Sequence, residues 1–169
     1  KAAAFCAGVI VVLVLMAIFV PVFSPYSYED VDYTALYATP NAQHWLGCDA
    51  AGRDMLMLLC YSLRNALIVG IGACAVQFVI GLLLGGISGY CGGRIDNLLS
   101  RVIDIMYGFP TFLFNLILVL LLGRSLFTIF FAIGLTSWAP MARLVRSQVI
   151  TVKQSDYVEA GHALGASNT

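Results

Sequence analysis

A short charged segment at residues 157–165, with the sequence YVEAGHALG, carries the residue types that point most clearly to a molecular task. Glu159 supplies a carboxylate, the small residues Ala160 and Gly161 follow it directly, and Gly165 lies four positions further on. A lone carboxylate beside small residues offers a partner a charge and a close approach. It does not provide the paired acid and base that catalysis requires. We therefore predict a docking surface rather than a catalytic site.

The same segment has the pattern of a short amphipathic helix, at about residues 155–165. Ser155 is a suitable N-cap, Asp156 in the first turn suits the helix dipole, and Gly165 is placed to stop the helix. Four residues at i, i+3, i+4 and i+7 share one face. They are Tyr157, Ala160, Gly161 and Leu164. This face either lies against the protein's own body or enters a groove on a partner.

Other combinations that could do chemistry are weak. His44 and Asp49 lack a third ligand nearby, and His162 stands alone, so we expect no metal site. The apolar stretches contain Gln77 and Asn115 but no histidine or charged residue between their ends, which argues against an intramembrane enzyme. We expect no catalytic residue and no cofactor bound by this chain.

The composition is that of a membrane protein. Hydrophobic residues make up 60% of the chain and charged residues 11%, and the mean hydropathy is +0.90. Soluble domains are about one quarter charged, so a lipid bilayer must be part of the solvent here. A net charge of zero without a basic patch argues against nucleic acid as a partner. Five cysteines without a CxxC motif argue against a disulfide framework or a zinc site.

Four uncharged stretches are long enough to cross a bilayer, and none alternates as a strand would. They are Ala2–Phe23, Asn65–Tyr90, Ile105–Gly123 and Ser125–Ala142. The prediction is an all-α, polytopic helical bundle with four transmembrane helices. We expect a first transmembrane helix at residues 1–23, an extracytoplasmic loop at 24–64, and a core transmembrane domain at 65–169. Because the chain begins at Lys1 and stops in a polar segment, we also expect it to be a fragment.

Basic residues favour a cytoplasmic N-terminus. In that orientation the cytoplasmic side holds Lys1, Arg94, Arg101, Arg143, Arg146 and Lys153. The outer side holds Arg53, Arg64 and Arg124. The segment at residues 155–165 is then cytoplasmic as well.

Several residues within the spans have possible structural or transport roles. Gly81, Gly85 and Gly89 form a row of small residues that permits close helix packing. Gln77 and Asn115 either bond a neighbouring helix or line a polar path.

Two prolines and one charged pair complete the predictions for the spans. Pro110 should bend the third span and shape a path, and Pro140 should kink the fourth. Arg101 and Asp104, three residues apart, can pair at the cytoplasmic boundary.

At this point the sequence resembles a known family. Residues 159–165, EAGHALG, are similar to the coupling signature E-A-A-x-x-x-G of permease subunits in bacterial ATP-binding-cassette importers. Residues 44–54, HWLGCDAAGRD, resemble the outer-loop signature H-x-L-G-T-D-x-x-G-R-D of the C-type permease in the dipeptide, oligopeptide and nickel class. The signature residues are His44, Gly47, Asp49, Gly52, Arg53 and Asp54. Three more family-like pieces follow in order: residues 89–96, 109–110 and 137–146.

The resemblance implies a type I ABC importer permease fold with six helices in the complete subunit. It implies a second, B-type permease subunit, two cytoplasmic ATPase subunits and an extracytoplasmic solute-binding protein as partners. The location would be the bacterial inner membrane. The ATPases would grip the segment at 155–165, with Glu159 at the interface.

Two residues depart from the signatures. Cys48 replaces a threonine, and we expect it to expose a thiol without changing the loop. Gly161 replaces an alanine, which weakens the helix by about 1 kcal/mol.

Asp49, Arg53 and Asp54 are expected to form a charged network that fixes the loop, or to contact a partner.

Three functions remain open at this stage. The first is import of peptides, and the second is import of nickel or another small solute by the same kind of permease. The third, from a different class, is a membrane anchor or assembly protein without transport activity.

Overall fold

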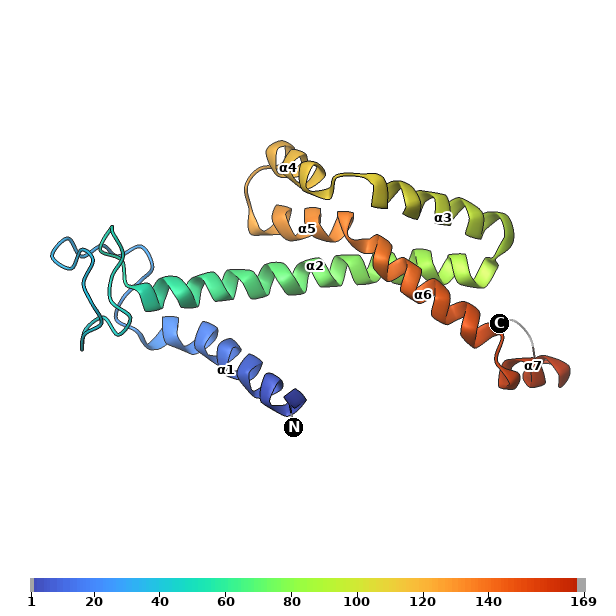
Figure 1. Ribbon diagram of the computed structural model, residues 1–169, viewed down its shortest axis with the longest axis horizontal. Helices are drawn as coiled ribbons and strands as arrows, with labels where there is room; N and C mark the ends of the chain where they lie inside the picture. The colour runs from blue at the N-terminus through green and yellow to red at the C-terminus, as the bar shows by residue number, and fades with distance from the viewer. Residues whose placement is uncertain (1, 167–169) are drawn as a thin grey trace. The chain divides into compact units, whose positions relative to one another are not determined.

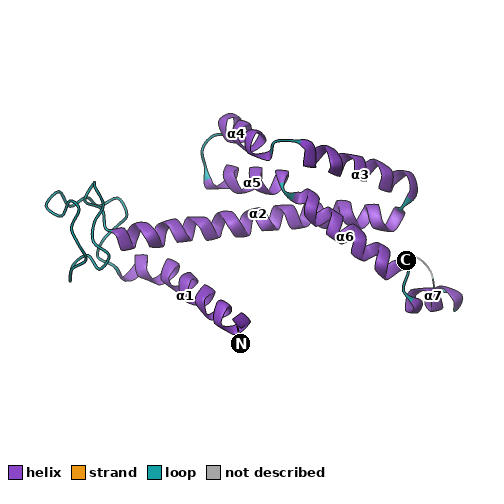
Figure 2. Cartoon of the chain, in the orientation of Figure 1, coloured by secondary structure: helices purple, strands orange, loops and turns teal. Residues whose placement is uncertain are grey.

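The computed structural model describes residues 2–166; Lys1, which counts toward the predicted orientation, and residues 167–169 lie outside them. Every regular element within residues 2–166 is a helix, which confirms the predicted all-α class (Figure 2). The chain divides into two compact units, Lys1–Ile68 and Val69–Thr169, and each is described by itself.

The first unit contains helix α1, a long loop and the beginning of helix α2. Helix α1 covers Ala2–Phe23, as predicted, and of its residues only Ala17 is buried. Such an apolar, exposed surface suits a helix that faces lipid. Helix α2 covers Met55–Cys91 and begins ten residues before the predicted span. It begins there because the carboxylate of Asp54 accepts a hydrogen bond from the Met57 amide at 2.9 Å, as an N-cap does.

The second unit contains the rest of α2 and five further helices (Figure 1). They are α3 (Gly93–Gly108), α4 (Thr111–Leu122), α5 (Leu126–Thr136), α6 (Trp138–Lys153) and α7 (Asp156–Ala163). Gly92 and Gly93, with φ angles of 64° and 55°, make the tight turn from α2 to α3. Both angles fall in the left-handed region, which glycine adopts without a steric penalty.

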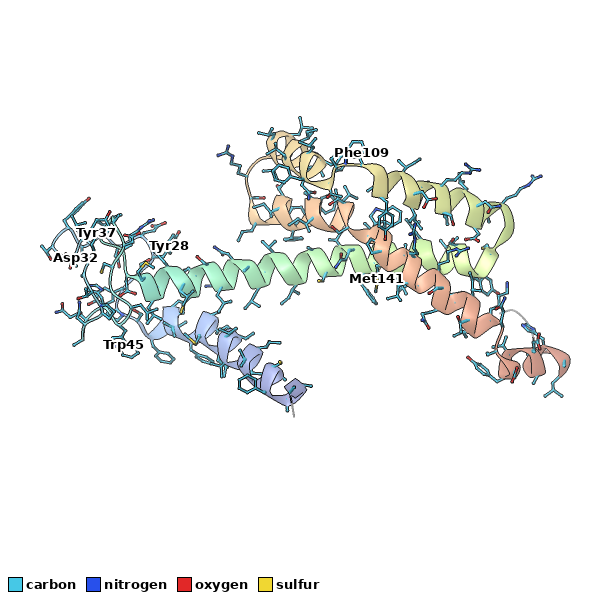
Figure 3. All side chains as sticks on the ribbon, viewed as in Figure 1. Tyr28, Asp32, Tyr37, Trp45, Phe109 and Met141 are labelled. Carbon is cyan, nitrogen blue, oxygen red and sulfur yellow. The ribbon has the colours of Figure 1, made fainter. Side chains whose placement is uncertain are left out.

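The third predicted span is broken rather than kinked. Helices α3 and α4 meet at 86°, and Phe109 between them is extended, with φ −90° and ψ 134°. The cause is Pro110, which disfavours a helical conformation in the residue before it. Its carbonyl then accepts hydrogen bonds from the Leu113 and Phe114 amides and starts α4. Figure 3 labels Phe109 at this elbow.

The fourth predicted span is also divided, at a different place from the one expected. Helices α5 and α6 form an angle of 45°, and Ser137 lies between them. The predicted kink at Pro140 is wrong, because Pro140 lies in the first turn of α6, where no intrahelical donor is needed. By length and composition, two described helices can cross a membrane, or up to four spans are present if each bent pair counts as one.

The glycine row on α2 packs against α6, as predicted. A Cβ atom on Gly81 would lie 2.7 Å from the Met141 Cβ, and one on Gly85 would lie 2.3 Å from the Ala142 carbonyl oxygen. Gly89 faces Val149 in the same way, at 2.8 Å. Figure 3 labels Met141 on α6. The two backbones can therefore approach closely only because these positions lack side chains.

The core of this unit lies beside the same contact. Its buried residues are Ile103, Trp138, Ala139 and Ala142, and Ile80, Leu84 and Met106 pack around them. The core therefore joins α2, α3 and α6.

We predict that Gly85→Ala destabilises the complete protein by about 1–3 kcal/mol, because the new methyl group overlaps the α6 backbone. Gly86→Ala is the matched control, since a Cβ atom there meets nothing within 4 Å. The control should be neutral or stabilising by up to about 1 kcal/mol. Thermal unfolding in detergent measures both, and equal melting temperatures for the two variants would contradict the packing.

Candidate functional site

Helix α7 forms where the charged segment predicted a helix. Its N-cap is Ser155, but the serine hydroxyl donates to the Val152 carbonyl at 2.6 Å instead of accepting from the helix. Its C-terminus has the two hydrogen bonds of a Schellman motif, Gly165 N–H to the His162 carbonyl and Ala166 N–H to the Gly161 carbonyl, both at 3.0 Å. Gly165 has φ of 90°, so the prediction that it stops the helix is confirmed.

The predicted face of α7 is open to solvent. Tyr157 is 69% exposed and Leu164 90% exposed, and Ala160 and Glu159 are also exposed. Within residues 2–166 the Glu159 carboxylate makes no hydrogen bond or ion pair. Gly161, the fourth residue of the face, is half-buried. The face is available to a partner.

Helix α6, which leads into α7, is held by a partly buried ion pair. The Arg146 guanidinium donates twice to the Asp96 carboxylate, from Nε at 2.5 Å and from an Nη atom at 2.6 Å. The Ser88 hydroxyl, which is fully buried on α2, donates to the same carboxylate at 2.6 Å. We call these three residues the corner clamp, because they join α6 to the turn between α2 and α3. Sequence reasoning quoted residues 89–96 and 137–146 as separate motifs and did not pair them.

Two further basic residues of α6 contact the same helices. Arg143 donates to Asp104 on α3 at 2.9 Å and lies over the Tyr107 ring at 4.5 Å. Asp104 thus pairs with Arg143 and not with Arg101, its predicted partner. Lys153, the last residue of α6, donates to the Tyr90 carbonyl of α2 at 3.0 Å.

The residues of the outer-loop signature form an ion pair and a separate hydrogen-bonded pair, not one network. The Asp49 carboxylate accepts from the Arg53 amide at 3.0 Å and from its guanidinium at 2.9 and 2.7 Å. Asp54 instead pairs with His44, whose Nδ1 lies 2.9 Å from a carboxylate oxygen. Both members of the second pair are buried, so the Asp54 carboxylate links the loop to the start of α2. The predicted single network of Asp49, Arg53 and Asp54 is therefore replaced by two separate pairs that hold the loop, and contact with a partner stays a prediction.

The two signature glycines allow the loop to pack on itself. Gly47 and Gly52 have φ angles of 75° and 79°. A Cβ atom on them would lie 2.3 Å from the Ala38 carbonyl oxygen and 2.2 Å from that of Asp32. The side chain of Cys48 lies in this packed region and is only 8% exposed, so the prediction of an exposed thiol is wrong. Burial also raises the pKa of the Cys48 thiol.

The path candidates in the spans have local partners. The Thr136 hydroxyl of α5 donates to the Asn115 side-chain oxygen of α4 at 3.0 Å, which is the interhelical bond that one of the two alternatives predicted. Gln77 donates to the Cys74 sulfur one turn earlier on α2, at 3.4 Å, and so bonds its own helix. A cavity of about 220 Å³ lies at the α3–α4 elbow, lined by the residues on either side of Pro110 but not by Pro110 itself. Its lining residues are Ile105, Met106, Phe109, Thr111, Phe114 and Thr136.

The described residues contain no group of three or more histidine, cysteine, aspartate or glutamate side chains arranged to hold a metal ion. Helix α7 is exposed, and its Glu159 carboxylate has no partner among the described residues. Helix α6 connects α7 to the α2–α3 turn. The described residues thus define a polytopic helical membrane protein with an exposed terminal helix.

Comparison with known proteins identifies the family. The family described as binding-protein-dependent transport system inner membrane component matches residues 81–169. The N-terminal TM domain of oligopeptide transport permease C matches residues 1–40. Because the first match covers more than half of the chain, this protein belongs to the binding-protein-dependent inner membrane component family, whose members have the type I ABC permease fold.

Curated relatives agree with this assignment. The dipeptide transport system permease protein DppC of Bacillus subtilis is 41% identical over 162 residues, which cover 95% of this chain and 51% of that protein. The oligopeptide transport system permease protein OppC of the same organism is 38% identical, over 95% of this chain and 53% of that protein. The nickel transport system permease protein NikC of Escherichia coli is 36% identical, over 95% and 58%. The chain thus spans about half the length of these relatives.

The two glycines of α7 should respond in opposite ways to alanine. Gly161→Ala adds a methyl group whose only neighbour within 4 Å is the Ala166 Cβ, at 3.9 Å, so it should stabilise α7 by about 1 kcal/mol. Gly165→Ala should destabilise its end by about 1–2 kcal/mol, because alanine disfavours a φ of 90°. Amide hydrogen exchange of α7 in the complete protein measures both. Changes of the same sign would contradict the helix end described here.

The loop that contains Asp49 and Arg53 should loosen in acid. The Arg53 amide, with help from its guanidinium, holds the pKa of the Asp49 carboxyl below its ordinary value of 3.8. A depressed pKa contributes stability that is complete above the ordinary value and is lost as pH falls through the lowered one. Hydrogen exchange at the Ala51 and Arg53 amides should therefore accelerate below pH 3.8, beyond its intrinsic pH dependence. Asp49→Asn should abolish this acid step, and an unchanged step in that variant would contradict the assignment.

Proposed function

We propose that the chain forms part of the permease subunit of an ATP-binding-cassette importer for peptides, and that α7 couples it to an ATPase. The observation that carries this proposal is the exposed face of α7, which coincides with the coupling signature at residues 159–165. A short helix with a stable end, on which Glu159 has no partner among residues 2–166, is suited to entering a groove on another protein. Peptides are the preferred solute because relatives at 41% and 38% identity are dipeptide and oligopeptide permeases.

The proposed partners follow from this role. A B-type permease subunit completes the path, and two cytoplasmic ATPase subunits dock on the coupling helices. An extracytoplasmic solute-binding protein delivers the solute. This chain contributes no ATP-binding residue and no cofactor, so hydrolysis occurs on the ATPases. The complex lies in the bacterial inner membrane, with the N-terminus and α7 on the cytoplasmic side, as the distribution of basic residues favours.

The proposed mechanism is rigid-body alternating access. ATP binding brings the two ATPases together, and each pushes on the coupling helix that it holds. Glu159 fixes α7 to its ATPase through charge, and the small residues Ala160 and Gly161 allow close contact. The movement opens the path to the outer side, where the loop at residues 41–54 faces the binding protein.

Nickel or another small solute is the second candidate. It is favoured by the 36% identity to a nickel permease, which is close to the identity with the peptide permeases. Transport assays of the complete system with labelled dipeptide and with nickel distinguish the two.

Glu159→Lys in the complete subunit tests the proposal. Reversing the charge should lower ATPase copurification or solute-stimulated ATP hydrolysis by at least about tenfold, because like-charge contacts cost several kcal/mol. Glu29→Lys is the matched control, since Glu29 is the other glutamate and lies in the outer loop. Its copurification should equal that of the unaltered protein.

Two results would contradict the proposal. One is unaltered coupling in Glu159→Lys. The other is an unaltered protein that binds no ATPase at all, which would favour the membrane anchor or assembly role.

A further inference from the structure

In the corner clamp, Arg146 of α6 binds Asp96 of α3, and the same carboxylate accepts a hydrogen bond from Ser88 of α2. The Asp96 side chain is 17% exposed and that of Arg146 is 32% exposed. The pair is bidentate, a geometry that fixes direction as well as distance. The buried Ser88 hydroxyl supplies a third bond to the carboxylate. By contrast, the Arg143–Asp104 pair has side chains that are 56% and 68% exposed, and such pairs contribute little.

The clamp is one of several contacts that hold successive parts of α6. The first is the glycine contact, where Gly81 and Gly85 of α2 receive the α6 backbone at Met141 and Ala142. The clamp at Arg146 follows about one turn later. At the end of α6, Lys153 donates to the Tyr90 carbonyl at 3.0 Å, two residues before Ser155, the N-cap of α7. Helix α6 is thus held at its beginning, middle and end to α2 and α3.

We propose that Asp96 and Arg146, with Ser88, are positioning residues for coupling: they make the α2–α3 turn follow α7. This inference rests on the proposed function. A force on α7 enters α6 at Lys153. Without the clamp, the cytoplasmic half of α6 can bend away from α3, and the displacement is lost in α6. With the clamp, the displacement reaches the α2–α3 turn.

The first test is a distance that does not depend on transport. In the complete subunit, assembled with its partners and with Cys6, Cys74 and Cys91 replaced by serine, spin labels are placed by Asp156→Cys on α7 and Leu98→Cys on α3. Both positions are exposed. We expect a narrow distance distribution that broadens in Asp96→Asn and stays narrow in Asp104→Asn. An unchanged distribution in Asp96→Asn overturns the proposal.

The second test is the amount of ATP hydrolysed per solute transported in proteoliposomes. Among complexes that still copurify with the ATPases, Asp96→Asn should raise this ratio by roughly 2- to 30-fold, the range for substitutions within a coupling network. Asp104→Asn should leave it unchanged. The exchange Asp96→Arg with Arg146→Asp should recover part of the loss, because it restores an ion pair at the same place.

The outcomes separate this proposal from the previous one. A broadened distance with an unchanged ratio means that the clamp serves stability alone, which overturns the proposal while the transport role stands. If Asp96→Asn does not fold, Arg146→Lys replaces it, because lysine keeps the charge but loses the bidentate geometry. This variant should give an intermediate ratio of ATP hydrolysed to solute transported. Failure of the unaltered protein to assemble with an ATPase overturns the proposed function, and this inference with it.

Discussion

Close contact between the backbones of α2 and α6 is the constraint on which the second unit depends. The missing side chains of Gly81, Gly85 and Gly89 let α6 lie directly on α2. In a bilayer, where apolar surface gives helices little reason to associate, such contact supplies dispersion energy that larger residues would prevent. It also brings Arg146 within reach of Asp96. Packing and charge therefore fix α6 together, and α6 determines where α7 is presented.

The polar residues have two structural roles. In the outer loop they fold the chain: Asp49 binds Arg53, and Asp54 both pairs with His44 and caps α2. In the second unit the clamp and Lys153 hold α6, while Glu159 on α7 stays unpaired within the described residues. The exposed Glu159 carboxylate on α7 is therefore separate from the contacts that hold α6 in place.

Sequence reasoning succeeded where local chemistry decides the structure. The predicted bounds of helix α1 agree with the structure because a long uncharged stretch forms a helix that faces lipid. The predicted end of α7 agrees because few residues other than glycine adopt the φ of Gly165. Sequence reasoning failed where residues far apart in the sequence determine burial or pairing. Cys48 is buried by the segment around Ala38, and Asp96 meets Arg146 across 50 positions, which no spacing rule detects. The break at Ser137 replaced a kink at Pro140 because a first-turn proline is compatible with a helix. The α3–α4 elbow is sharper than predicted because Pro110 acts on Phe109 as well as on its own turn.

The central claim, that α7 meets an ATPase on the cytoplasmic side, is tested most directly by a crosslink. A single cysteine is introduced by Ala163→Cys, at an exposed position of α7, in the complete subunit without other cysteines and coexpressed with its ATPases. The account predicts a crosslink between α7 and an ATPase in membrane vesicles, with a yield that changes when nucleotide is added. A cysteine that forms no crosslink and reacts only with reagents from the outer side would contradict both the orientation and the coupling role.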